Sequence, residues 1–374
     1  MSLQPGAPQS QITCSLEQAL LDDNPIYEAL SYTWGDAKEQ TMILCNGSLL
    51  PVTRNLEEAL QRLRYEDRTR RLWVDAICVN QQDNIERGYQ VSIMRDIYST
   101  ADCVIVWLGP ERDDSRKAID FMVKLCEVLC TSVESTAYEL THDYEEFFER
   151  TGDACAHTLL KGYLQSLEAT SLAAVDRFFH RSWFGRIWVI QEVTRDSRVI
   201  ALCGDETVAF EVLVLAVNIL SAAQVQGFVQ YPFHDSSLPR IDLMRSKMNL
   251  EGYSFPRLFF YTRCFSATDS RDMIYALLGC SGDKHIQNIV PDYGLAVSKV
   301  HLAFASNLFN QLYGLDALSY VRHTLNDGGV PAGSPSWLPA YADRTGSDSL
   351  SILMRGNAAA SFDLKANYSL QYSR

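Results

Sequence analysis

The pattern of apolar and polar positions at the start of the chain predicts short strands. Residues 27–34, 41–45 and 48–52 are β-prone. Asn46-Gly47 between the last two runs is a strong hairpin signal, because both residues tolerate the positive φ angles of a tight turn.

The next elements alternate between helix and strand. Apolar residues at helical spacing fill residues 56–63, and Asn55 before them could cap that helix. Residues 72–79 and 103–108 are nearly continuous apolar runs, as in parallel strands covered on both faces. Between them, apolar residues recur every four positions over residues 85–101. The order predicts a right-handed βαβ unit.

This order predicts an α/β fold in which helices flank a parallel sheet. We expect a polar lead-in over residues 1–24 and a compact domain over residues 25–205. A helical, acidic insertion is predicted at 111–180, and residues 206–374 form a mainly helical C-terminal region. The weak patterning of the last thirty residues also fits a fragment of a longer protein.

Composition narrows the class of protein. A net charge of −13 over 374 residues disfavours nucleic acid as a partner. Ten cysteines without a C-x-x-C pair fit a reducing compartment. We see neither a signal peptide nor an apolar run long enough to span a membrane, so we expect a soluble cytoplasmic protein.

Several familiar sites have no matching motif. The sequence lacks the glycine-rich phosphate loops and the G-x-S-x-G nucleophile elbow. Its seven histidines do not form a zinc-binding pattern. We therefore expect no metal and no bound cofactor.

The remaining candidates are polar residues near strand ends. Asp36 follows the first strand, and ligands of open parallel sheets bind beyond the carboxyl ends of the strands. Asp75 lies within a run that should otherwise be apolar, so it is either a structural hydrogen-bond hub or a functional group. The residues leave these two readings open.

Glu192 is the leading candidate for catalysis. It stands four residues after Trp188 in an aromatic segment, so we expect both side chains on one helical face, with the carboxylate partly desolvated. The alternative is a helix-surface glutamate paired with Arg186 or Arg195. The residues alone favour this ion pair.

Three aromatic-rich motifs resemble the fungal heterokaryon incompatibility (HET) domain, and the resemblance covers about residues 27–205. They are LSYTWGD at 30–36, LWVDAICVNQQDNIERGYQVSIMRDIYSTADCVIVWLG at 72–109 and RSWFGRIWVIQE at 181–192. DSRDMIYALLG (269–279), VPDYG (290–294) and PSWLP (335–339) resemble segments that commonly follow this domain.

The resemblance implies a role in self/non-self recognition and programmed cell death. The HET family is considered similar to TIR domains, which implies a TIR/flavodoxin-like sheet. The position that matches the catalytic glutamate of TIR enzymes is Glu192. The implied substrate site would include Tyr32, Trp34, Gly35, Asp36, Asp75, Arg186 and Trp188, with aromatic rings stacking on a base or pyridine and Arg186 meeting a diphosphate.

TIR-type chemistry cleaves the bond between nicotinamide and ribose in NAD. Nicotinamide leaves as a neutral molecule, so no general acid is needed. One carboxylate can stabilise the oxocarbenium-like ribose. NAD would then be a substrate and not a cofactor.

Two other hypotheses compete with catalysis by Glu192. One is a non-catalytic signalling module that assembles with itself or with protein partners. The other, and weaker, is a metal-dependent hydrolase with Asp75, Asp83 and Glu86 as ligands, although helix capping is the favoured role of Asp83 and Glu86.

Overall fold

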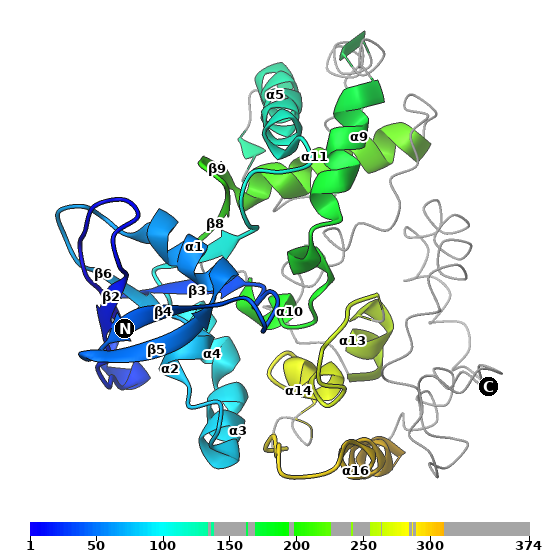
Figure 1. Cartoon of the computed structure of the whole chain (residues 1–374). Helices are drawn as coiled ribbons and strands as arrows, with labels where there is room; N and C mark the ends of the chain where they lie inside the picture. Colours follow the sequence, from blue (N-terminus) through cyan, green and yellow to red (C-terminus); the bar gives the residue numbers. More distant parts are fainter. Residues whose placement is uncertain are drawn as a thin grey trace, which may run out of the picture.

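The protein is described from a computed structural model of the whole chain (Figure 1). The structure describes residues 1–133, 169–193, 198–225, 255–262, 264–283 and 289–309, and the single positions 136, 137, 162, 163, 241 and 286.

A nine-stranded sheet runs through the described residues, and four parallel strands form its centre. Side by side they are β6 (Arg70–Trp73), β3 (Glu28–Tyr32), β7 (Cys103–Trp107) and β8 (Arg198–Cys203). The first of them along the chain thus lies between the second and the third. The predicted α/β fold with a largely parallel sheet and flanking helices is confirmed.

Both edges of the sheet are antiparallel. β4 (Gln40–Cys45) and β5 (Ser48–Thr53) form the predicted hairpin, with φ angles of 49° at Asn46 and 79° at Gly47. Positive φ at both positions is what a type I′ turn requires. At the other edge, β9 (Glu206–Ala209) pairs with β8 and extends the sheet beyond residue 205.

The first residues belong to the sheet, which corrects the expectation of a polar lead-in. β1 (Ser2–Leu3) pairs with β6, and β2 (Thr13–Ser15) pairs with both β1 and β4. Leu3, Ile12 and Cys14 are buried there. A few apolar side chains at wide spacing suffice, because the neighbouring strands supply the rest of the core.

The run 72–79, predicted as one strand, is divided between a strand and a helical turn. β6 ends at Trp73, and α2 (Asp75–Cys78) follows it. The prediction that Asp75 lies within a strand is therefore wrong. Asp75 lies just beyond the carboxyl end of β6, at the start of α2.

The predicted helix over 85–101 is also divided. α3 (Asn84–Ser92) and α4 (Met94–Ser99) meet at Ile93. The expected apolar stripe is buried only in its second half, since Ile97 is buried whereas Ile85 and Tyr89 are 86% and 60% exposed.

Alternate side chains of the central strands face two apolar cores. Leu30 and Ile105 face the core that contains α1 (Arg54–Leu63). Ala29 and Val104 face a larger core, which includes side chains of α5 (Ser115–Val133), α9 (Ala169–Phe179) and α11 (Phe210–Val225). Such alternation is typical of a strand covered on both faces.

The C-terminal helices pack on the larger core. They are α13 (Phe255–Thr262), α14 (Asp272–Leu278) and α16 (Val297–Phe309), drawn in yellow to gold in Figure 1. The described parts of residues 111–180 are mainly helical, with α5 and α9 as the longest elements. Residues 310–374, with the PSWLP motif, lie outside the described residues, and the domain boundaries at 25 and 205 stay predictions.

Among the helices that the structure describes, none combines the length and the apolar character that crossing a membrane requires.

Candidate functional site

A buried ionic centre lies where the RSWFGRIWVIQE segment meets β3. Arg186 donates to both carboxylate oxygens of Glu192, from Nη1 to Oε2 at 3.1 Å and from Nη2 to Oε1 at 3.0 Å. The hydroxyl of Ser31 donates to Oε2 as well. Glu192 is only 1% exposed, so the pair and the hydroxyl take up the whole carboxylate.

Electrostatics in this centre reflect burial opposed by pairing. Burial raises the pKa of Glu192, while Arg186 and Ser31 act against the rise. For Arg186 burial acts to lower the pKa, but Glu192 and then Asp75 overcome it, so its pKa is raised. Arg186 thus lies near two carboxylates, of which only Glu192 receives its hydrogen bonds.

Ser31 carries the link between strand and carboxylate. It is fully buried on β3, and its Oγ accepts a hydrogen bond of 2.8 Å from Nε1 of Trp183. Trp183 belongs to the short 3-10 helix Ser182–Gly185, which precedes Arg186. A hydroxyl that both accepts and donates satisfies the indole and the carboxylate at once.

Asp75 forms the second acidic position of the site. Its Oδ2 accepts a hydrogen bond of 2.8 Å from Nε1 of Trp34, whose side chain is 43% exposed. The hydroxyl of Tyr32 is buried near Asp75 but makes no hydrogen bond of good geometry within the described residues. Burial raises the pKa of Asp75, and the bond from Trp34 opposes the rise.

The ends of β3 and β7 are joined by one side chain, Asn55. Its amide donates to the carbonyl of Thr33 at 2.6 Å and accepts from Nε1 of Trp107 at 3.0 Å. Thr53, and not Asn55, occupies the N-cap position of α1, so the predicted cap is wrong. Asn55 instead holds the two strands at the point where the strand order switches, which in open α/β sheets is the usual ligand position.

The structure brings together five of the eight predicted site residues. Four share mutual electrostatic interactions, and the fifth, Trp34, joins through its bond to Asp75. They are Tyr32, Trp34, Asp75, Arg186 and Glu192.

The other three predicted residues have separate roles. Asp36 forms an exposed turn, in which Oδ1 accepts from the amide of Lys38 at 2.9 Å. Gly35 has a φ angle of 80° in the same turn, a conformation that other residues rarely adopt.

Trp188 and Glu192 lie one helical turn apart, since the amide of Glu192 donates to the carbonyl of Trp188 at 3.2 Å, but their side chains bind different partners. The helix α10 (Val189–Glu192) is a single turn, and Trp188 precedes it. The indole of Trp188 donates to Asp272 at 3.2 Å, whereas Glu192 points to Ser31. In so short a helix the surrounding segments, and not helical periodicity, decide where the side chains point.

The ion-pair reading of Glu192 is therefore the one that the geometry matches, with Arg186 as partner. The pair is buried and not on a helix surface. Asp272 and Ser31 were missed by the sequence reasoning. For Ser31 a signal existed, because a hydroxyl residue stands in an otherwise apolar buried strand.

The three proposed metal ligands act separately. Asp83 caps α3 by accepting from the amides of Ile85 and Glu86, as predicted, and Glu86 accepts from the amide of Asn80. The carboxylate of Asp75 accepts the hydrogen bond from Trp34. Within the described part of the chain, no group of three or more histidine, cysteine or acidic residues could hold a metal ion.

Comparisons with known proteins agree with the three motifs. Residues 27–192 match the family model described as "Heterokaryon incompatibility protein (HET)". The chain is 27% identical over 328 residues to "Heterokaryon incompatibility protein 6, OR allele" of Neurospora crassa, across 75% of this chain and 46% of the relative. The chain thus spans about half the length of that curated relative. No solved structure matches.

Proposed function

We propose that this chain, whose residues 27–192 match the model of the heterokaryon incompatibility (HET) family, acts in heterokaryon incompatibility, as a signalling module that works through protein assembly. The family match carries the biological role. The observation that favours assembly over catalysis is the closed state of Glu192, which is 1% exposed and bonded through both oxygens.

A second observation favours protein partners. α3 presents two large apolar side chains to solvent, Ile85 at 86% and Tyr89 at 60% exposure. They lie one turn apart on the same helix face, and exposed apolar groups of this kind favour association. Programmed cell death would follow from recruitment of other proteins.

TIR-type cleavage of NAD by Glu192 is the second candidate. The parallel strands lie in the order second, first, third, fourth along the sheet, which is the order of flavodoxin-like folds and supports a TIR-like relation. Glu192 lies at the carboxyl ends of these strands. Exposed Trp34 beside Asp75 offers a ring on which a base could stack.

Catalysis would require Glu192 to leave its ion pair. Arg186 has a second carboxylate nearby, Asp75, which could pair with the guanidinium when Glu192 is released. The freed carboxylate would then stabilise the positive ribose as nicotinamide departs, and water would add to the same ribose carbon with release of a proton.

One pair of measurements separates the two candidates. Glu192→Gln and wild type are compared for nicotinamide release from NAD by the purified full chain at high concentration, and for incompatibility in cells. Retained incompatibility in folded Glu192→Gln supports the assembly module. A loss of release of about a hundredfold or more, together with loss of incompatibility, would support catalysis instead.

The control variant is Ile85→Asp, which alters the exposed face of α3 without touching the ionic centre. The assembly module predicts that this variant loses incompatibility at normal expression and folding. If neither variant alters incompatibility, the proposed function is wrong.

A further inference from the structure

The short helix that carries Glu192, α10, is too short to be stable without contacts from other segments. α10 contains only four residues, and an isolated turn of helix is unstable in water. Its place is therefore set by what packs on it. It packs against α4 and, through Ser31, against β3. It also packs against a segment outside the residues matched to the HET family, residues 265–283 and 289–295, here called the clasp.

The clasp binds the backbone on both sides of Arg186. The amide of Ser266 donates to the carbonyl of Gly185 at 2.8 Å, and the amide of Ile187 donates to the carbonyl of Ser266 at 3.0 Å. These two bonds form a small parallel bridge. The residue that pairs with Glu192 is thus fixed by the clasp.

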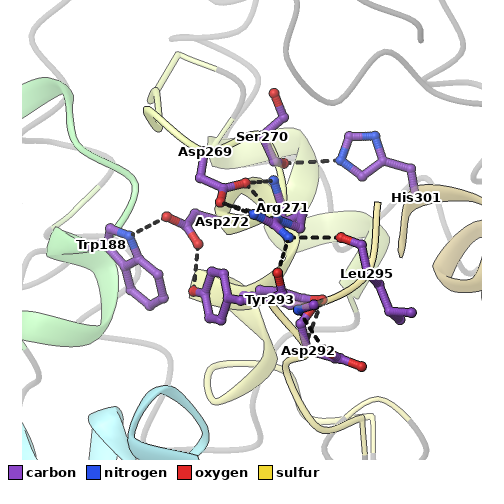
Figure 2. A network of polar contacts seen from close by, with 11 residues as sticks. Trp188, Asp269, Ser270, Arg271, Asp272, Asp292, Tyr293, Leu295 and His301 are labelled. Carbon is purple, nitrogen blue, oxygen red and sulfur yellow. Dashed lines mark hydrogen bonds and ion pairs between the residues drawn. The ribbon is translucent and has the colours of Figure 1, made fainter. Parts of the chain in front are cut away.

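Figure 2 shows the side-chain centre of the clasp. Both oxygens of Asp272 are used: Oδ2 accepts from Nε1 of Trp188 at 3.2 Å, and Oδ1 accepts from the hydroxyl of Tyr293 at 2.7 Å. Asp272 is 7% exposed. It joins the residue that precedes α10 to the far end of the clasp.

Arg271 closes the clasp on itself. It pairs with Asp269 at 2.7 Å and donates to the carbonyls of Tyr293 at 2.6 Å and Leu295 at 2.8 Å (Figure 2). The guanidinium of Arg87 on α3 lies 3.5 Å from the centre of the Tyr293 ring. The clasp is therefore attached to α3 as well as to α10.

Two close approaches show how tightly the clasp fits. A Cβ atom at Gly88 of α3 would lie 2.2 Å from the carbonyl oxygen of Pro291. At Gly279 it would lie 3.3 Å from Cβ of Arg95 and 3.3 Å from Nε2 of Gln191. Gln191 directly precedes Glu192, so the clasp reaches the ionic centre from two directions.

We propose that the clasp holds Glu192 in its closed ion pair, with Asp272 as the positioning residue that acts through Trp188, and that release of the clasp opens the centre. This inference rests on the proposed function, because it concerns the regulation of the same centre. It requires no assumption about which partner or ligand uses the opened state.

The test measures how fast the Glu192 carboxylate of the full chain is labelled by a water-soluble carbodiimide and glycine ethyl ester, using mass spectrometry. Asp272→Ala should raise the labelling rate of Glu192 at least tenfold, because the indole of Trp188 loses its anchor. Glu28, paired with Arg70 at the other end of β3, should keep its wild-type rate and so report that the protein is folded.

Two further variants make the result decisive. Trp188→Phe removes the N–H donor and keeps a smaller aromatic ring, and it should give a smaller rise where Asp272→Ala does not fold. Asp283→Ala removes a carboxylate at the end of the clasp that binds the amide of Phe255 on α13 and not α10, so it should leave Glu192 protected. Folded Asp272→Ala and Trp188→Phe with Glu192 labelling within twofold of wild type would overturn the proposal.

The labelling result does not depend on biological activity. If the clasp variants raise the labelling of Glu192 but neither Glu192→Gln nor Ile85→Asp alters incompatibility, the clasp proposal is supported and the proposed function is wrong. If Glu192 stays protected while Ile85→Asp abolishes incompatibility, the reverse holds.

Discussion

Asp272 shows how the environment of one residue can create a property that its type does not have. Burial is the main reason that its pKa rises from 3.8 to about 6, with Asp269 adding to the rise. Tyr293 and Trp188 oppose the rise by hydrogen bonding, and Arg87 opposes it by its charge. Protonation of the carboxylate would therefore remove the free-energy cost of keeping a charge away from water.

We predict that Asp272 makes the protein less stable as the pH rises. Since the folded pKa lies above the unfolded one, its stabilising contribution is full below pH 3.8 and is lost as the pH rises through about 6. The gap corresponds to about 3 kcal/mol. Urea unfolding of wild type and Asp272→Asn between pH 4 and pH 7 should show a steeper decline in wild type, and the difference between the two is the contribution of Asp272.

Asp269 provides the contrast for this measurement. Its pKa is lowered by Arg271 despite burial, so its contribution is present above its unfolded pKa and is lost as the pH falls. Asp269→Asn should therefore remove a pH dependence of opposite sign. Identical pH profiles of wild type and Asp272→Asn would contradict the assignment.

Helix α3 combines an exposed apolar pair with a tight backbone contact. Ile85 and Tyr89 are exposed, whereas Gly88, which lies beside them on the helix, admits the backbone of Pro291. Glycine in the middle of a helix normally costs about 0.5–1 kcal/mol relative to alanine. Here the close approach of the clasp reverses that preference.

We predict that Gly88→Ala destabilises the protein, although alanine is the better helix former. A Cβ atom 2.2 Å from a backbone oxygen cannot be accommodated unless the clasp moves away. The loss should be on the order of 1–3 kcal/mol, as for other overpacked sites. Urea unfolding measures it, with Ile85→Ala on the exposed face as the control that should change stability by less than about 0.5 kcal/mol. An increase in stability for Gly88→Ala would show that the clasp does not contact α3.

The larger core joins residues 27–192, here called the HET segment, to the C-terminal helices α13, α14 and α16. It contains Val104 of β7 and Ile190 of α10 together with Ile274 of α14 and Phe304 of α16. Apolar burial in this core therefore depends on both parts at once. The residues matched to the HET family, 27–192, are only part of the folding unit.

We predict that the described parts unfold in a single transition. Urea unfolding followed by tryptophan fluorescence and by far-UV circular dichroism should give coincident curves. Most tryptophans lie in the HET segment, whereas circular dichroism also reports the C-terminal helices. A separate, earlier loss of helical signal would mean that the C-terminal helices are only loosely docked.

The sequence by itself determined the features that depend on near neighbours. The Asn46-Gly47 hairpin, strands β3 and β7 and the cap at Asp83 follow from local patterns of apolar spacing and turn chemistry. The three motifs also predicted the similarity to the HET family that the comparisons found, and the pairing of Glu192 with Arg186 was foreseeable because they are only six positions apart.

Only the tertiary structure decided the contacts between distant residues. Ser31 and Glu192 are 161 positions apart, and Trp188 and Asp272 are 84 apart. The short strands β1 and β2, and the helical start at Asp75, likewise depend on neighbours that other segments supply. Local periodicity reflects the helix or strand preference of a few neighbouring residues. The packed fold decides whether a carboxylate is buried and which partner compensates its charge.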